Sequence, residues 1–291
     1  MKNIVPILTV VAAIVVIWYA AAIPMNSQWA LDQAERAEVE LSTGELILDT
    51  WSQERPRLPA PHQVVSELWG STVEMKVTSK RSLIFHGWIT LSATMLGFAF
   101  GTGLGILLAV GIVHSRAMDM GVMPWAIASQ TIPILAIAPM IIVVLSSVGV
   151  TGLLPKALIS TYLSFFPVAV GMVKGLRSPE AMHLDLMKTY SASRSNVFWK
   201  LRVPASMPYL FTSMKVAVAA SLVGAIVGEL PTGAVAGLGA RLLAGSYYGQ
   251  TVQIWSALFA AAIMAALLVT LIGMLGTWVN RRMGVRPEAA R

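Results

Sequence analysis

Residues 185–208 read DLMKTYSASRSNVFWKLRVPASMP. The stretch carries one acid and four bases and ends in a pair of prolines, yet long uncharged runs border it on both sides. A helix that crosses the hydrocarbon core of a bilayer needs about 20 predominantly apolar residues. A charged segment between two such runs therefore predicts a loop outside the membrane, in a chain that crosses the membrane several times.

The composition of the whole chain is that of a membrane protein. Of its 291 residues, 56% are hydrophobic and only 12% are charged, whereas a soluble domain is about 25% charged. Backbone polar groups in lipid must be satisfied internally, so apolar spans are expected to be helical. We predict an all-α membrane protein with about six transmembrane helices. The stretches long enough to span are roughly 3–24, 83–113, 120–147, 153–173, 207–230 and 252–279.

The residue inventory excludes several kinds of enzyme. The chain has no cysteine, and its four histidines include no metal-spaced pair, so the sequence predicts no metal site. The Gly-rich stretch GTGLG (101–105) lies inside an apolar span, and no G-x-x-x-x-G-K-[ST] motif occurs anywhere. Because that motif is what cradles phosphates in a P-loop, we expect neither nucleotide binding nor ATP hydrolysis by this chain.

The chain divides into four segments. Residues 1–24 are predicted to form an N-terminal transmembrane helix, with a cleaved signal peptide as the alternative; an apolar run of about 19 residues is long for a signal peptide. Residues 25–82 are polar and predict an extracytoplasmic amphipathic segment and linker. Residues 83–283 predict a core of five transmembrane helices, and 284–291 a cytoplasmic tail.

The distribution of charge sets the orientation. With the N-terminus inside and six alternating helices, the cytoplasmic side holds 13 bases and four acids, and the other side holds eight bases and ten acids. This asymmetry follows the positive-inside rule. It also accounts for the net charge of +7 without nucleic acid. Both termini and residues 185–208 are therefore predicted to be cytoplasmic.

The cytoplasmic segment fits two short helices within residues 179–204. Pro179 suits the start of the first, Ser193 can cap the second, and Pro204 is expected to end it. Apolar side chains can share one side across the two helices, with a basic fringe around them. Such a ridge fits docking into a protein groove or lying on anionic lipid, and the pattern leaves both open.

The same segment resembles the "EAA" loop of permease subunits in ATP-binding-cassette importers. Asp185 stands at the motif's Glu, Leu186 and Met187 at its two Ala, Ser191 at its Gly, and Pro204 at its final Pro, with the spacing intact. The resemblance covers about 58–283. Within it, the chain is similar to the nitrate/sulfonate/taurine branch of these permeases. The similar stretches include LPAPHQVVSELW (58–69), IPILAIAPMIIV (132–143) and GLGARLLAGSYYGQT (237–251).

This resemblance implies a type I importer permease in a bacterial inner membrane, with a cytoplasmic coupling helix in the loop 176–206. The expected partners are ATPase subunits that carry ATP and Mg, a second permease copy, most simply as a homodimer, an extracytoplasmic solute-binding protein and the lipid bilayer. The solute, a small anion or an organic molecule such as a sulfonate or vitamin precursor, stays open. The residues expected to couple to the ATPase are Asp185, Met187, Lys188, Tyr190, Ser191, Arg194, Val197, Phe198, Leu201 and Pro204.

Other residues are candidates for helix packing or for the translocation path. Gly97, Gly101 and Gly105 recur every four residues, a spacing that lets membrane helices approach closely. Glu229 lies at the outer boundary of the fifth span, where hydration and a gating role are both open, and Lys215 can either snorkel or contribute to an inner gate. Pro124, Pro133 and Pro139 are expected to break the third span, either to line the path or as a plain structural kink. The path or gate residues are Gln130, Pro133, Pro139, Ser146, Ser147, Lys215 and Glu229.

A secondary transporter driven by an ion gradient is the alternative class. It would require ionisable residues in mid-membrane and inverted repeats. The spans carry almost no charge and show no convincing repeat.

Overall fold

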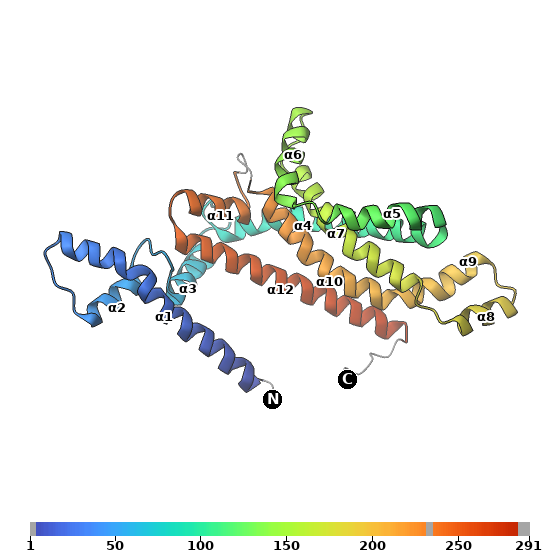
Figure 1. Ribbon diagram of the computed structural model, residues 1–291, viewed down its shortest axis with the longest axis horizontal. Helices are drawn as coiled ribbons and strands as arrows, with labels where there is room; N and C mark the ends of the chain where they lie inside the picture. Colours follow the sequence, from blue (N-terminus) through green and yellow to red (C-terminus); the bar gives the residue numbers. More distant parts are fainter. Residues whose placement is uncertain (1–3, 231–234, 285–291) are drawn as a thin grey trace. The chain divides into compact units, whose positions relative to one another are not determined.

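The computed structural model describes residues 4–230 and 235–284, and all regular structure within them is helical (Figure 1). Five of the described helices are long and apolar enough to cross a membrane, or six spans if one bent pair counts as a span. The predicted all-α membrane fold is therefore confirmed. The elements are α1 (Ile4–Arg36), α2 (Thr43–Ser52), α3 (Pro61–Trp69), the π-helical turn η1 (Gly70–Glu74), α4 (Leu83–His114), α5 (Arg116–Ser129), α6 (Ile134–Ser147), α7 (Leu153–Leu176), α8 (Ala181–Thr189), α9 (Arg194–Val197), the π-helical turn η2 (Phe198–Arg202), α10 (Val203–Gly228), α11 (Leu238–Tyr247) and α12 (Thr251–Arg282).

The chain forms two compact units, one of residues 1–87 with 236–261 and the other of 88–235 with 262–291. In the first unit, α1 continues as one helix through Pro24 to Arg36. The sequence predicted that the first helix ends near residue 24 and that a separate amphipathic helix follows. The two merge because most of residues 25–36, MNSQWALDQAER, are good helix formers such as Met, Gln, Ala and Leu. Of the predicted tail 284–291, all but Gly284 lies outside the described residues.

A buried amide holds α1, α2 and the segment before α3 together. The Asn26 side chain is fully buried. Its Nδ2 donates to the carbonyl oxygens of Thr50 (3.0 Å) and Leu58 (2.8 Å), and its Oδ1 accepts from the backbone N–H of Leu58 (3.1 Å). Because an unsatisfied buried amide is costly, this arrangement fixes one path for the proline-rich segment that the sequence suggested as a linker.

In the second unit, α7 and α10 pack along much of their length, and Figure 1 shows them side by side. Their core is formed by apolar side chains that include Ile112, Val168 and Val218. The predicted packing glycines lie where α4 meets α7. A Cβ added at Gly97 would lie 2.7 Å from the Ala157 carbonyl oxygen, and one added at Gly105 would lie 2.7 Å from that of Phe165. At Gly101 the nearest backbone atom would be the nitrogen of Phe165, at 3.1 Å. Only residues without a side chain permit this approach.

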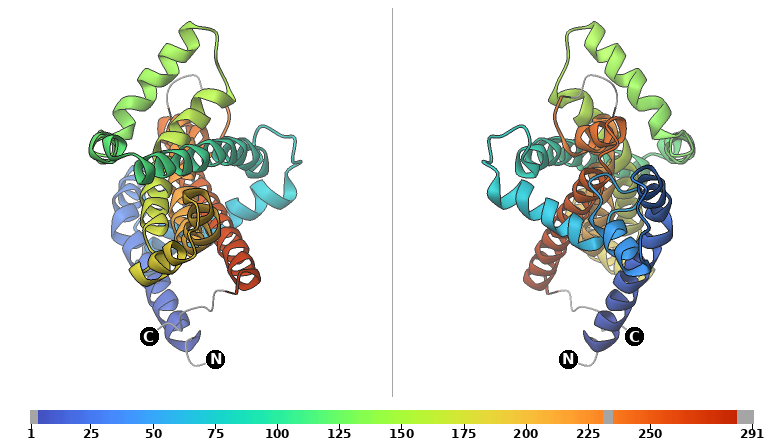
Figure 2. Two further views of the ribbon diagram at one scale, coloured as in Figure 1. Left: turned by 90° about the vertical axis from the view of Figure 1, so that its right-hand side faces the viewer. Right: turned by 90° about the vertical axis from the view of Figure 1, so that its left-hand side faces the viewer.

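The third span, 120–147, is broken, as its prolines predicted. It is divided into α5 and α6, which are bent by 98° relative to each other, as both views of Figure 2 show. Gln130 ends α5 and Pro133 precedes α6. Proline lacks an N–H and disfavours helix in the residue before it, which breaks the run at this point. The Tyr162 hydroxyl of α7 donates to the Ser129 carbonyl oxygen beside the break.

Candidate functional site

The charged segment forms a helical elbow, residues 177–202, between α7 and α10. Figure 1 shows α8 and α9 lying beyond the ends of these two helices. The Ser193 side chain accepts from the N–H of Asn196 at the start of α9, which confirms the predicted cap. The first short helix begins at Ala181, with Glu180 before it, two residues later than predicted from Pro179.

The turn between α8 and α9 is formed by Ser191. This residue has φ = 50°, and its N–H donates to the Lys188 carbonyl oxygen at 2.8 Å. The left-handed region costs a residue other than glycine about 1–2 kcal/mol. The family motif has glycine at this position, so the chain keeps the turn with a side chain that strains it.

The elbow runs into α10 without a break. In η2 the backbone N–H of Val203 donates to the Phe198 carbonyl oxygen, and α10 begins at Val203 with Pro204 in its first turn. The prediction that Pro204 ends the second short helix is therefore wrong. A proline in the first turn needs no hydrogen-bond donor, and the wide π-helical turn before it accommodates the ring. Residues Arg194–Gly228 form one helical path of 35 residues.

The inner side of the elbow is fixed to the membrane helices. Phe198 packs against the apolar core, and its ring centroid lies 5.1 Å from that of His114 at the end of α4. Arg202 Nη1 donates to the carbonyl oxygen of Leu176, the last residue of α7, at 3.3 Å. Phe198 was expected to contact a partner protein. The structure instead gives it an internal contact, because its side chain points back toward the core.

The outer side of the elbow carries large exposed apolar residues: Met182 (70% exposed), Leu186 (53%), Tyr190 (78%) and Trp199 (65%). Of these, only Tyr190 was among the predicted coupling residues, while Met187, Val197, Leu201 and Pro204 are half-buried. The helical pattern predicted one shared apolar side that included Phe198 and assigned no role to Trp199. The tryptophan within this short charged segment was the sequence feature that could have indicated an exposed aromatic residue on the outer side.

Charged side chains surround this outer side. Lys188 Nζ lies 2.8 Å from Asp185 Oδ1, and both side chains are exposed. Arg194 and Lys200 are exposed as well. At the base of the elbow, Arg177 pairs with Asp119 of α5 at 2.9 Å. Exposed pairs of this kind contribute little stability, so these charges are available to a partner.

At the opposite end of α10, Glu229 lies in a polar cluster formed by three helices. Its side chain is fully buried. Thr90 Oγ1 of α4 lies 3.0 Å and 2.9 Å from the two carboxylate oxygens, and Lys156 Nζ of α7 lies 3.5 Å away. The reading of Glu229 as a hydrated boundary residue is therefore wrong. A buried carboxylate needs such partners. Lys156, for which the sequence predicted no role, is a base in the first turn of the neighbouring helix α7.

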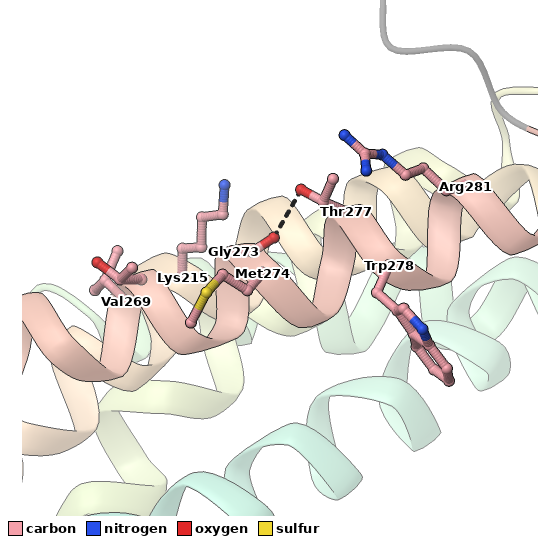
Figure 3. A pocket seen from close by; sticks show the side chains of 8 residues that line it. Lys215, Val269, Gly273, Met274, Thr277, Trp278 and Arg281 are labelled. Carbon is pink, nitrogen blue, oxygen red and sulfur yellow. Dashed lines mark hydrogen bonds between the residues drawn. The ribbon is translucent and has the colours of Figure 1, made fainter.

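The other path candidates do not converge with this cluster. Gln130 and Pro133 lie at the bend between α5 and α6, and Pro139, Ser146 and Ser147 are exposed along α6. Lys215 lies beside α12, where a Cβ added at Gly273 would be 3.5 Å from its Nζ (Figure 3).

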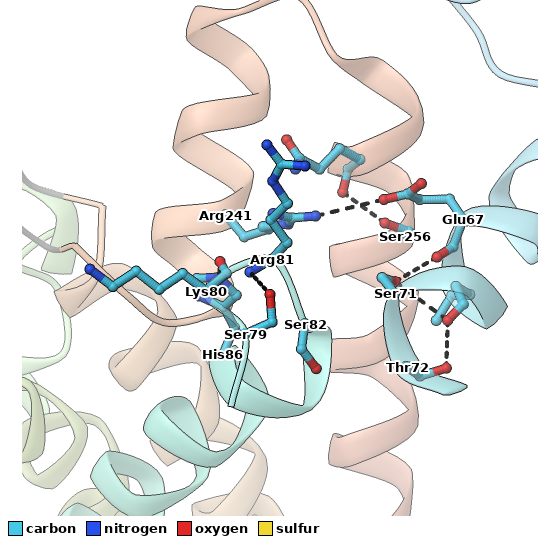
Figure 4. Close-up of polar contacts among 12 residues, drawn as sticks. Glu67, Ser71, Thr72, Ser79, Lys80, Arg81, Ser82, His86, Arg241 and Ser256 are labelled. Atoms are coloured by element: carbon cyan, nitrogen blue, oxygen red, sulfur yellow. Dashed lines mark hydrogen bonds and ion pairs between the residues drawn. The ribbon is translucent and has the colours of Figure 1, made fainter. Parts of the chain in front are cut away.

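In the first unit, polar contacts join α3 to α11 and order the loop before α4 (Figure 4). Arg241 of α11 pairs with Glu67 of α3 at 3.6 Å. Burial lowers the pKa of the Arg241 guanidinium, the Glu67 carboxylate raises it, and nearby Arg81 lowers it. His86 Nδ1 accepts from the Gly237 N–H at 3.0 Å and its Nε2 lies 2.9 Å from the Lys80 carbonyl oxygen. This geometry fits the neutral ring with its proton on Nε2.

Comparison with known proteins places these features in context. Residues 101–285 match the family described as "Binding-protein-dependent transport system inner membrane component". The formylaminopyrimidine transport permease protein ThiX of Halalkalibacterium halodurans is 33% identical over 62% of this chain and 68% of its own length. The riboflavin transport system permease protein RibX of Chloroflexus aurantiacus is 30% identical over 80% and 81%. The nitrate import permease protein NrtB of Leptolyngbya laminosa is 24% identical over 75% and 78%.

Among solved structures, the inward-facing MetNI methionine ABC transporter has a similar fold. One of its crystal forms gives a TM-score of 0.57 at 19% identity, covering 69% of this chain and 96% of that one. A second crystal form gives the same TM-score at 18% identity. At this level of identity the likeness concerns the fold alone, and it agrees with the type I importer fold that the sequence predicted.

Proposed function

Because the chain belongs to the family of binding-protein-dependent transport system inner membrane components, we propose that this importer permease is driven through its elbow by a separate ATPase subunit. One observation carries the proposal. The elbow presents Leu186, Tyr190 and Trp199 to solvent, while Phe198 and Arg202 fix its inner side to α4 and α7. Exposed aromatic anchors suit a protein groove, and a fixed base transmits force to the helices.

The coupling contact is apolar at its centre and charged at its rim. Trp199 and Tyr190 enter a groove of the ATPase, and Arg194, Lys200 and the Asp185–Lys188 pair lie around them. Charges in such a rim chiefly affect the rate of association. ATP and Mg bind to the ATPase, while this chain binds no cofactor and catalyses no reaction.

The complete importer contains two ATPase subunits, a second copy of this permease and an extracytoplasmic solute-binding protein. Both termini of the permease are cytoplasmic, since this orientation satisfies the positive-inside rule. The solute-binding protein contacts the opposite face, to which the first unit contributes the α3–α11 contacts and the loop before α4. Part of the outer loop, 231–234, lies outside the described residues.

The solute is a small anion or an organic molecule, and the binding protein selects it. The names of the relatives support this breadth, since they include permeases for formylaminopyrimidine, riboflavin and nitrate. The bend at Gln130–Pro133 and the α6 residues Pro139, Ser146 and Ser147 line the path, and the Glu229 cluster with Thr90 and Lys156 stabilises its outer end.

Reconstituted uptake tests the proposal. The full transporter in liposomes is expected to stop importing solute when vanadate blocks ATP hydrolysis and to continue in the presence of an uncoupler. Leu186→Asp and Trp199→Asp are expected to remove co-purification of the ATPase while the permease keeps its melting temperature. Tyr248→Asp, which alters another exposed aromatic residue, is the matched control. Uptake that stops only with the uncoupler would establish the secondary-transporter alternative.

A further inference from the structure

A large cavity of about 930 Å³ lies between α7, α10 and α12 in the second unit. Two of its lining residues are basic, and both come from helix ends: Lys174 from the last turn of α7 and Arg281 from the last turn of α12. Phe166 and Val170 of α7 also line it. Phe166 precedes Lys174 by eight residues, which corresponds to about 12 Å along a helix. The cavity is thus cationic at the helix ends and apolar deeper in the span.

A second cavity of about 610 Å³ adjoins the first, since Thr277 and Arg281 line both. It adds a third base, Lys215. Figure 3 shows Lys215 and Arg281 extending to the same side of α12 with Thr277 between them, while Trp278 points the other way. Among the described residues that line the two cavities there is no carboxylate, so an anion is the complementary ligand.

A buried polar atom in the first cavity indicates a second property of the ligand, besides its negative charge. Asn280 lines this cavity, and its side-chain oxygen is buried without a hydrogen-bond partner among the described residues. Buried polar atoms in proteins are nearly always hydrogen-bonded. The complementary ligand therefore carries a hydrogen-bond donor as well as a negative charge.

The surroundings are those of a membrane–water interface. The Arg282 guanidinium lies 4.9 Å from the centre of the Trp278 ring, and Lys174 Nζ lies 5.9 Å from that of Tyr209. Aromatic side chains beside basic ones are typical at the level of lipid head groups. Basic pockets between transmembrane helices at this level are known to bind anionic head groups.

We propose that this cavity binds an anionic phospholipid whose head group carries hydroxyls, as in phosphatidylglycerol. The phosphate lies between Lys174 and Arg281, a head-group hydroxyl donates to Asn280 Oδ1, and the start of an acyl chain lies along Phe166, Val170 and Val216. A free oxyanion such as phosphate or a sulfonate would satisfy the bases but would leave the apolar wall without a partner. The inference is independent of the coupling role of the elbow.

The test compares lipids on the purified full-length permease. Native mass spectrometry counts the lipids retained after delipidation and addition of phosphatidylglycerol or phosphatidylethanolamine, and melting temperature is measured in parallel. We expect wild type to retain phosphatidylglycerol selectively and to melt at a higher temperature with it. The double variant Lys174→Gln/Arg281→Gln is expected to bind it at least about tenfold more weakly, because charge-assisted hydrogen bonds are lost.

Two control variants distinguish specific lipid binding in the cavity from a general effect of lost positive charge and from binding of a free anion. Arg116→Gln/Lys188→Gln removes the same charge at exposed positions outside the cavity and is expected to bind phosphatidylglycerol as wild type does. Val216→Trp, at a half-exposed residue of the apolar wall, keeps every charge and is expected to exclude the acyl chain. Equal loss in the control double variant, unchanged binding in Val216→Trp, or an equal thermal shift with inorganic phosphate or butanesulfonate would each overturn the proposal.

Discussion

The rings of Phe198 and His114 meet edge to face, with centroids 5.1 Å apart and planes at 69°. This contact joins the elbow to the end of α4. The next residue, Trp199, packs edge to face on Phe198 with ring centroids 5.1 Å apart, yet it is 65% exposed. Of these two adjacent aromatic residues, Phe198 packs against the core, while Trp199, which contacts Phe198, is largely exposed.

Truncating these two residues is expected to separate stability from coupling. Phe198→Ala should lower the free energy of unfolding by about 2 kcal/mol, less than the 3–5 kcal/mol for a fully buried ring. Trp199→Ala removes a largely exposed ring that contacts Phe198. It should lower the free energy of unfolding by no more than about 1 kcal/mol and should reduce co-purification of the ATPase. Denaturant titration in detergent and a pull-down measure the two effects. Equal destabilisation by both variants would contradict the assignment.

The strained turn at Ser191 predicts a stabilising substitution. Ser191→Gly relieves about 1–2 kcal/mol of left-handed strain but adds freedom to the unfolded chain, so a net gain of about 0.5–1 kcal/mol is expected. Ser191→Val, which is β-branched, should instead destabilise the elbow. Melting temperatures of the two variants are compared with wild type, and a loss of stability in Ser191→Gly would show that the turn is not strained.

The Glu229 cluster predicts a specific role for one hydroxyl. Thr90→Val removes the donor that lies within 3.0 Å of both carboxylate oxygens and should destabilise the protein by about 1–3 kcal/mol, the usual penalty for an uncompensated buried group. Thr90→Ser keeps the hydroxyl and serves as the matched control. Thermal unfolding of the two purified variants distinguishes them. Equal melting temperatures for Thr90→Val and Thr90→Ser would show that the hydroxyl does not stabilise the buried carboxylate.

The capping box at the start of α2 predicts a pH dependence. Hydrogen bonds from the Ser42 side chain and backbone lower the pKa of the Glu45 carboxyl. A lowered pKa in the folded state means that the ionised carboxylate stabilises the helix above the ordinary pKa of a glutamate and that this contribution is lost as pH falls through the lowered value. Amide exchange at Leu46 and Ile47, corrected for intrinsic rates, should show less protection in acid, and Ser42→Ala should remove most of that difference.

The sequence was sufficient for the fold class and the family, because both depend on the length of apolar runs and on motif spacing. It also identified Gly97, Gly101 and Gly105 as packing residues, although not α7 as the helix that they approach. It also predicted a break in the third span from Pro124, Pro133 and Pro139, but not that the break lies at Pro133 alone, since proline also occurs inside unbroken helices such as α1 at Pro24. The partners of Glu229 were missed for a related reason: Thr90 and Lys156 are 139 and 73 residues away in the chain, and only tertiary packing brings them together.

The unbroken path Arg194–Gly228 has a mechanical consequence. At 1.5 Å per residue, its 35 residues extend about 50 Å, longer than the hydrocarbon core of a bilayer. One end belongs to the elbow and the other stops beside Glu229. If this path tilts as a unit by about 5° about its middle, each end, about 25 Å away, moves by about 2 Å, and the two ends move in opposite directions.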